Sequence, residues 1–125
     1  MSKVVSICLP HPSRVLRPNR PVHWSVRARA VKRARVAARL RMLMALGELP
    51  GAVRSEFAPV WYRLVWFYKG TRPDADNCLA ACKAYLDGCC DALKVDDRDL
   101  ECAGIRREHD MKRAGQVELC FSEDF

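Results

Sequence analysis

The sequence predicts a single small domain of the α/β class (α+β), spanning residues 1–125, with a mixed sheet of about four strands and two main helices. The chain has 125 residues and half of them are hydrophobic, which suits one modest core. Segments rich in β-branched and aromatic residues alternate with segments rich in good helix formers, in the order β-α-β-α-β-β. Stretches containing proline or glycine separate these segments.

The first half of the chain predicts a strand, a loop and a long helix. Residues 3–9 are short, apolar and β-branched, and four prolines between residues 10 and 21 then require a loop. Residues 24–46 contain no proline or glycine and are rich in alanine, arginine, leucine and methionine. Ser25 is a candidate cap for this helix. Apolar residues recur there at steps of three and four, so we expect one buried stripe made of Val31, Ala34, Ala38, Met42 and Ala45.

The second half predicts a central strand, a second helix and two further strands. Residues 60–69 are dense in aromatic and β-branched residues without clean alternation, which is typical of a strand buried on both faces. Its aromatic residues are therefore assigned to the core rather than to base stacking. A helix is expected from Asp74 or Ala75 to Leu93, with aspartate as its cap and Gly88 allowing close packing. Residues 101–110 and 116–121 are the last predicted strands.

The charge distribution favours a polyanionic partner. The net charge is +7, and residues 1–47 contain eleven Lys and Arg residues with no acid. Such a segment suits nucleic acid better than a membrane surface, because it lacks a wide apolar face with aromatic anchors. The residues that we expect to contact DNA are Arg17, Arg20, Arg27, Arg35 and Arg72.

Cysteine content and hydropathy point to the cytoplasm. No secretory signal is evident and no apolar run approaches the length of a membrane span, so no membrane partner is expected. The seven cysteines are an odd number, and reduced thiols are expected. Cys78, Cys82 and Cys89 fall near one helix face, but their spacing matches no common structural zinc pattern. Core packing is the preferred role for them, and a zinc protein is a third alternative.

The acidic residues suggest a metal site. Asp74 and Asp76 begin the second helix, where their carboxylates can share one region of space, and such oxygen donors suit Mg²⁺ or Mn²⁺. A helix of about 18 residues is roughly 27 Å long. Asp97 must therefore return to the site through a neighbouring strand or another subunit. Lys83 lies two turns after Asp76 on the same face, where it could help protonate a leaving oxygen, and it can pair with Asp87 at the i, i+4 spacing.

Each of these features also has a purely structural interpretation. An aspartate at a helix start is often only a cap, two consecutive aspartates can form a turn, and a Lys–Asp pair is usually a solvated face. A non-catalytic basic protein that binds nucleic acid is therefore the alternative to a metal-dependent nuclease.

Several motifs together resemble the RusA family of Holliday junction resolvases, in its phage-type branch. They are the motif Asp74-x-Asp76-Asn77, the helix carrying Lys83 and Leu86-Asp87, and the run from Leu93 to Asp97. The opening segment from Ile7 to Trp24 and the closing run from Gly115 to Leu119 are also similar to that family. The resemblance covers about residues 4–121.

The resemblance implies a homodimeric endodeoxyribonuclease that binds four-way DNA junctions and cuts two strands symmetrically with Mg²⁺ or Mn²⁺. It implies that Asp74, Asp76 and Asp97 hold the metal and that a lysine on the second helix takes part in catalysis. Ala80 stands where the family lysine is expected, and Lys83, one turn later, takes that role. The resemblance also fits a protein encoded by a phage or prophage and acting in the host cytoplasm.

Overall fold

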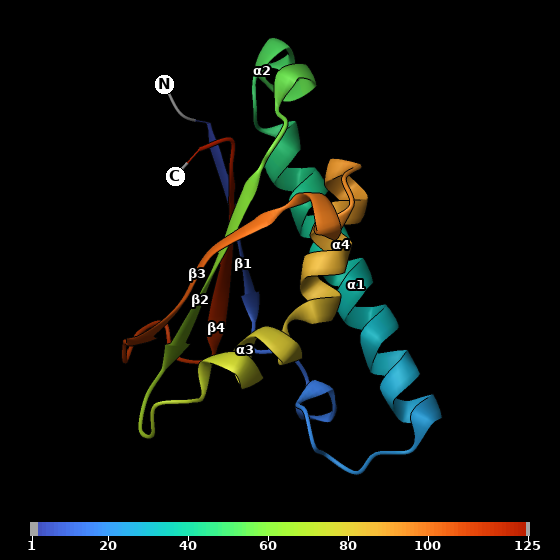
Figure 1. Cartoon of the computed structure of the whole chain (residues 1–125), viewed down its shortest axis with the longest axis vertical. Helices are drawn as coiled ribbons and strands as arrows, with labels where there is room; N and C mark the ends of the chain where they lie inside the picture. The colour runs from blue at the N-terminus through green and yellow to red at the C-terminus, as the bar shows by residue number, and fades with distance from the viewer. Residues whose placement is uncertain (1–2, 125) are drawn as a thin grey trace.

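A four-stranded sheet with its helices packed against one face forms the fold. The computed structural model describes residues 3–124 (Figure 1). The main elements are β1 (Val4–Pro10), α1 (Trp24–Gly47), β2 (Trp61–Tyr68), α3 (Ala75–Ala81), α4 (Lys83–Leu93), β3 (Glu101–His109) and β4 (Gln116–Ser122). Three short helices join them, namely η1 (Arg14–Leu16), α2 (Gly51–Glu56) and η2 (Asp97–Asp99). The predicted α+β class is confirmed. The predicted order of elements holds apart from the short helices and the division of the second helix into α3 and α4.

The sheet is mixed, as predicted. Its strand order is β1-β4-β2-β3, with β2 and β3 parallel and the other two pairs antiparallel. β2 therefore lies inside the sheet, which explains why its apolar residues do not alternate with polar ones. Leu64 and Trp66 are buried in the main core cluster, and Val65 and Phe67, which alternate with them along the strand, are buried as well. A search of residues 3–124 for a helix with the length and hydropathy needed to cross a bilayer finds none.

Helix α1 matches its predicted range to within one residue but differs in detail. Ala34, Ala38 and Met42 are buried as predicted, whereas Val31 is 37% exposed and Ala30 is buried instead. Ala45 is only partly buried. The buried stripe is thus built mainly from alanine, whose small side chain lets a neighbouring helix come close. The cap is His23 rather than Ser25, because its ring nitrogen Nδ1 accepts the backbone N–H of Ser25 at 3.2 Å.

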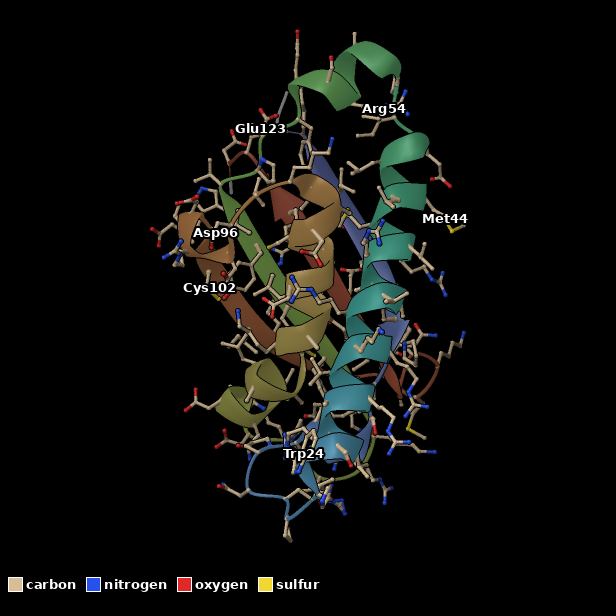
Figure 2. All side chains as sticks on the ribbon, turned by 90° about the vertical axis from the view of Figure 1, so that its right-hand side faces the viewer. Trp24, Met44, Arg54, Asp96, Cys102 and Glu123 are labelled. Carbon is tan, nitrogen blue, oxygen red and sulfur yellow. The ribbon has the colours of Figure 1, made fainter. Side chains whose placement is uncertain are left out.

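Helix α4 packs directly on α1, and Gly88 makes this possible. A Cβ atom at Gly88 would lie 2.1 Å from the carbonyl oxygen of Arg35 and 3.0 Å from the Cβ of Ala38. The two helices lie side by side in front of the sheet when the molecule is viewed from the helical side (Figure 2). The close packing predicted for this glycine is therefore confirmed.

A bidentate ion pair also joins α1 to α4. Arg35 donates from Nε to Asp91 at 2.6 Å and from Nη2 to the other carboxylate oxygen at 2.8 Å. The hydrogen bonds and the charge of Asp91 raise the pKa of Arg35 further above its already high value. The geometry is favourable, but the Arg35 side chain is 49% exposed, so solvent screening weakens the pair.

A double-mutant cycle on Arg35→Ala and Asp91→Ala should give a small favourable coupling energy. We expect roughly 0.5–1 kcal/mol at low ionic strength, the upper range for an exposed pair, because the guanidinium engages both carboxylate oxygens. Urea unfolding of the four proteins of the cycle measures it, and repetition in 1 M NaCl should reduce it. A coupling that salt leaves unchanged would show that packing rather than charge links the two residues.

The second predicted helix is interrupted, which corrects one expectation. Residues 75–93 form α3 and α4, separated at Cys82, whose backbone has φ −94° and ψ 4°. The N–H of Cys82 contacts the carbonyl oxygens of both Cys78 and Leu79 at 3.1 Å, so the hydrogen-bonding ladder tightens there. The two helices consequently point in different directions (Figure 1). The short helix α2 was also not predicted.

The helical cysteines lie in the core, as predicted. Cys78, Cys82 and Cys89 are at most 2% exposed and belong to the main hydrophobic cluster. Burial raises the pKa of Cys78 to about 11, so its thiol stays protonated at neutral pH. These residues act as small hydrophobic side chains between the helices and the sheet.

Candidate functional site

The start of α3 presents two exposed carboxylates. Asp74 is the N-cap of the helix, and its Oδ1 accepts the backbone N–H of Asn77 at 3.2 Å. Asp76 lies in the first turn and is exposed. Among residues 3–124, neither carboxylate pairs with a lysine or arginine. The cap predicted from the sequence is confirmed, and both side chains have oxygen atoms free for another ligand.

Asp97 returns to the bend between α3 and α4. It is the first residue of η2, which follows the C-terminal end of α4, yet its carboxylate forms an ion pair with Nζ of Lys83, the first residue of α4. The segment after α4 thus runs back along that helix. Asp97 thus reaches Lys83 within one chain, but within residues 3–124 it does not form one metal-binding group with Asp74 and Asp76.

Lys83 binds two carboxylates at once. Besides Asp97, its ammonium contacts Oδ1 of Asp87 at 3.0 Å, which confirms the predicted i, i+4 pair. Partial burial opposes the charged form, but the hydrogen bonds to Asp97 and Asp87 outweigh it and raise the pKa of Lys83 above its usual value. The ammonium is therefore charged at neutral pH and balances much of the negative charge of its two partners.

The predicted site residues are only partly assembled. Asp74 and Asp76 lie at one end of α3, whereas Asp97 and Lys83 meet at the other end, where α4 begins. In the part of the chain that the structure describes, no three His, Cys, Asp or Glu side chains are close enough together to hold a metal ion. The interruption at Cys82 also removes the basis for placing Asp76 and Lys83 on one straight helix face.

The donor chemistry of these residues still fits a hard divalent cation. All three predicted ligands are carboxylates, the oxygen donors that Mg²⁺ and Mn²⁺ prefer. Asp74 and Asp76 have free oxygen atoms, whereas Asp97 must exchange the Lys83 ammonium for a metal. For the three carboxylates to share one ion, the segments on the two sides of the bend must also move closer together.

The predicted DNA-binding arginines differ in their availability. Arg17 lies in the loop after η1, and Arg72 is exposed just before α3. Arg27 donates from Nη2 to the carbonyl oxygen of Arg20 at 3.3 Å, which ties the proline-rich loop to α1 while both side chains remain polar surface groups. Arg35 is engaged by Asp91, so it is the least available of the five.

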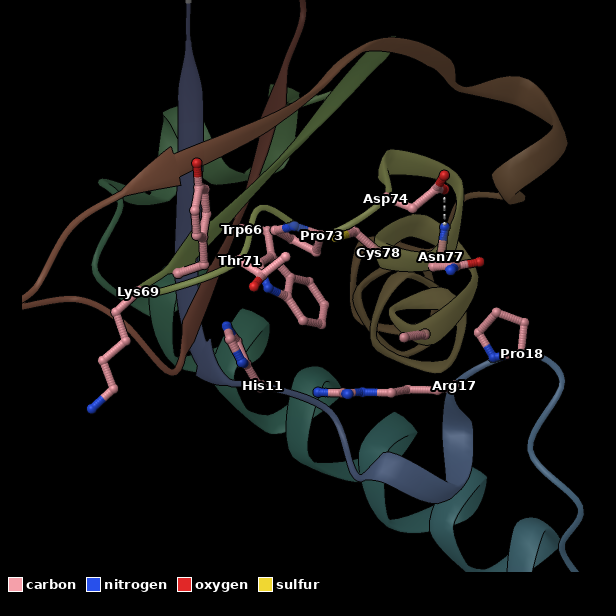
Figure 3. Close-up of a pocket in the computed structure, with 12 residues that line it drawn as sticks. His11, Arg17, Pro18, Trp66, Lys69, Thr71, Pro73, Asp74, Asn77 and Cys78 are labelled. Atoms are coloured by element: carbon pink, nitrogen blue, oxygen red, sulfur yellow. Dashed lines mark hydrogen bonds between the residues drawn. The ribbon is translucent and has the colours of Figure 1, made fainter.

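A cavity of about 400 Å³ opens beside Asp74 (Figure 3). It lies between the end of β2, the start of α3 and the loop that follows β1. Its walls include His11, Arg17, Trp66, Lys69 and Asn77. The His11 ring stacks on the Trp66 indole, with ring centroids 4.2 Å apart and an interplanar angle of 27°.

Sequence reasoning missed most of this cavity. His11 and Lys69 were assigned no role, and Trp66 was assigned only to the core. These residues are separated by up to 58 positions, and only the pairing of the strands brings them together. No local motif marks these residues. The sequence feature that could have suggested a stacking site is the combination of the proline-rich loop and the aromatic-rich strand.

Replacing Lys83 by methionine should change metal binding and cleavage in opposite directions. The variant keeps the length of the aliphatic side chain but removes a positive charge next to Asp97, so the affinity for Mn²⁺ should rise by roughly 10-fold. Junction cleavage should fall, because the ammonium that stabilises phosphate charge is lost. Calorimetric Mn²⁺ titration and a cleavage assay measure the two effects. Lys112→Met, at an exposed position in the turn between β3 and β4, is the control, and weaker Mn²⁺ binding by Lys83→Met would contradict the prediction.

Protonation of His11 should destabilise the fold. Burial lowers the pKa of His11 below 6.5, and the hydrogen bond with the carbonyl of Phe67 at 2.9 Å opposes this only in part. The unfolded chain therefore takes up this proton more readily than the folded chain. The stability that neutral His11 contributes is fully present above pH 6.5 and is lost as the pH falls through the folded-state pKa. The loss is at most about 1.4 kcal/mol per pH unit for one proton. Urea unfolding between pH 5 and 7.5 should show this slope in the wild type and a smaller one in His11→Gln.

Comparison with known proteins places the chain in a family without naming an activity. No family model matches the chain. A protein of Xylella fastidiosa (strain Temecula1 / ATCC 700964), described as an uncharacterized protein, is 40% identical over 122 residues, which cover 94% of this chain and 75% of that relative. The chain therefore belongs to the same family as this Xylella protein.

Proposed function

We propose that the protein is a Mg²⁺-dependent endodeoxyribonuclease that resolves four-way DNA junctions by paired hydrolysis of phosphodiester bonds. The observation that carries the proposal is the return of Asp97 to Lys83 at the bend after α3, whose other end presents Asp74 and Asp76. The three carboxylates and the lysine that the RusA resemblance implies thus come from one short helix and the segments next to it.

The residues of the chain have separate roles in this proposal. Asp74, Asp76 and Asp97 would hold Mg²⁺ or Mn²⁺, and Lys83 would neutralise charge on the scissile phosphate or help protonate the leaving oxygen. When bound, the divalent ion lowers the pKa of a water molecule and stabilises negative charge on the phosphate. The ion pair between Lys83 and Asp97 keeps the lysine charged and close to the bend until DNA and metal bind.

The basic N-terminal segment would hold the junction arms. Residues 3–47 carry no acidic side chain, so phosphate contacts made there meet no repulsion from within the segment. Arg17, Arg20, Arg27 and Arg72 are the main candidates, and such contacts select the shape of the DNA rather than its sequence. Two copies of the chain would place two sites across one junction, as two-fold symmetry allows. The setting that we propose is the cytoplasm of a bacterium, with a phage or prophage as the source.

A junction-cleavage assay tests the proposal. The purified protein is incubated with Mg²⁺ or Mn²⁺ and a four-way junction labelled on each strand in turn, and a linear duplex of the same sequence is the control. We expect paired nicks placed symmetrically about the branch point, which disappear in EDTA. Junction binding without cleavage in either metal would contradict the proposed activity.

A non-catalytic basic protein that binds nucleic acid is the second candidate. Two observations favour it: Asp74 already serves as a helix cap, and the three carboxylates do not form one group within residues 3–124. For such a protein, Asp74→Asn should leave DNA affinity unchanged or increase it, since asparagine also caps helices and repels no phosphate. This candidate would be favoured if Asp74→Asn binds DNA with full affinity and the wild type makes no metal-dependent nicks.

A further inference from the structure

We infer that the cavity beside Asp74 holds one unstacked nucleotide of the DNA strand next to the cut. This inference rests on the proposed function and adds a binding site to it. The cavity is defined by His11, Arg17, Trp66, Lys69, Asp74 and Asn77, and we call it the nucleotide cavity.

The position of the nucleotide cavity connects it with the proposed site. Asp74 belongs both to the predicted metal ligands and to the rim of the cavity, and Asn77, one helical turn later, lies on the same wall (Figure 3). A DNA strand whose phosphate lies at the carboxylates of α3 must therefore pass the mouth of the cavity. The neighbouring nucleotide is the group closest to entering it.

The chemistry of the walls fits a nucleotide. The half-buried His11 ring, which stacks on the buried Trp66 indole, offers the cavity an aromatic surface that favours the face of a base. Arg17 and Lys69 supply positive charge for a phosphate, and neither pairs with an acid among residues 3–124. The exposed amide of Asn77 can both donate to and accept from the edge of a base.

A hydrogen bond to the backbone holds the His11 ring in place. Burial lowers the pKa of His11, so the ring is neutral at neutral pH. Its Nε2 lies 2.9 Å from the carbonyl oxygen of Phe67, which can only accept, so Nε2 donates this hydrogen bond. The ring is thus held by the backbone of β2, and it is rigid enough to form a stacking surface.

The size of the cavity favours one nucleotide over a base pair. About 400 Å³ lies near the lower end of the range for sites that bind small molecules. A base at the branch point of a junction has lost part of its stacking, so drawing it out costs less than drawing one from a continuous duplex. The cavity would therefore favour branched DNA and could make cleavage depend on the base beside the cut.

A base-deletion cycle tests the inference. Wild type and Asn77→Ala are titrated in EDTA with a junction in which each nucleotide near the branch is replaced in turn by an abasic residue. On the intact junction, Asn77→Ala should bind roughly 2- to 10-fold more weakly, the effect of one hydrogen bond. At one position, the two proteins should bind the abasic junction with equal affinity. That shared affinity need not equal the affinity of the wild type for the intact junction.

Two further variants make the test specific. His11→Ala should show the same dependence on the same base, with circular dichroism verifying its fold. Arg14→Gln is the matched control, because Arg14 lies on η1 near Arg17 but does not line the cavity. Its effect on affinity should be equal on intact and abasic junctions.

The outcomes separate this inference from the proposed function. The wild type could make paired nicks while no single base removal abolishes the effect of Asn77→Ala. That result would overturn the nucleotide cavity and would still support the nuclease. The base dependence without nicks in Mg²⁺ or Mn²⁺ would support the cavity and overturn the nuclease. Binding of free deoxynucleoside monophosphates, with no base dependence on DNA, would show that the cavity serves a free nucleotide and would overturn the inference.

Discussion

Replacement of Asp76 by asparagine should reduce Mg²⁺-dependent junction cleavage by more than about 100-fold. Loss of a residue that only supports a metal ligand already costs 10- to 100-fold in metal affinity or activity, and a ligand itself should cost more. Asparagine keeps the size of the side chain and one oxygen atom but removes the negative charge that binds a hard cation. Asp76 is exposed and unpaired within residues 3–124, so the fold should tolerate the change.

The same variant should bind the junction at least as tightly as the wild type. Removal of a negative charge near the DNA reduces repulsion of phosphate, so affinity measured in EDTA should stay equal or increase. Asp99→Asn is the matched control, because Asp99 is an exposed aspartate in η2, two residues from Asp97, with no assigned role. It should cleave at the wild-type rate.

Asp97→Asn should also lose activity, but for two reasons that a stability measurement can separate. It would remove a predicted metal ligand, and it would also remove a partner of the Lys83 ammonium. Thermal unfolding should show a small loss of stability for Asp97→Asn, because its ion pair with Lys83 is partly exposed. Asp76→Asn should show no such loss, because Asp76 has no ion pair among residues 3–124. Full cleavage by either variant would contradict the assignment of these carboxylates to the metal.

Local sequence patterns determined most of the fold. The ranges of the four strands and of α1 agree with prediction to within about one residue, because periodic apolar residues and proline breaks define them. The i, i+4 pair between Lys83 and Asp87 was predictable for the same reason, since helix geometry alone places both side chains. These features depend only on residues close together in the sequence.

Features that depend on distant contacts were not predictable. The bend at Cys82 carries no proline or glycine as a signal, and it forms where α3 turns away from α4. The path that returns Asp97 to Lys83 follows from how the segment after α4 packs, not from its spacing along the chain. Likewise, His11 and Trp66 stack only because β1 and β2 both pair with β4.

Replacement of Gly88 by alanine should lower stability far more than the same change at the other two helical glycines, Gly47 and Gly51. The new Cβ would lie 2.1 Å from the carbonyl oxygen of Arg35 and 2.9 Å from its carbonyl carbon. Both atoms belong to the backbone of α1, so no rotamer change can relieve the contact. Either α1 and α4 must separate or the backbone of one must shift, and both responses loosen the packing around Ala38, which is fully buried.

The expected cost is about 3 kcal/mol, at the top of the usual range for overpacking. Alanine has a better helix propensity than glycine, which offsets roughly 0.5–1 kcal/mol of this cost. For a chain of this length, a net loss of about 2–2.5 kcal/mol corresponds to a fall in Tm of roughly 8–10 °C. Thermal unfolding followed by circular dichroism measures it.

Gly47→Ala is the matched control, because the same methyl group is added to a helix where no atom lies within 4 Å of the new Cβ. Gly47 is the last residue of α1, and its φ is not in the left-handed region, so alanine can adopt its conformation. This variant should unfold at the wild-type temperature or slightly above it. If Gly88→Ala were as stable as Gly47→Ala, α1 and α4 could not be in contact at Gly88. The Arg35–Asp91 pair and the placement of the α3–α4 bend that presents Lys83 to Asp97 depend on the same packing, so they would also have to be revised.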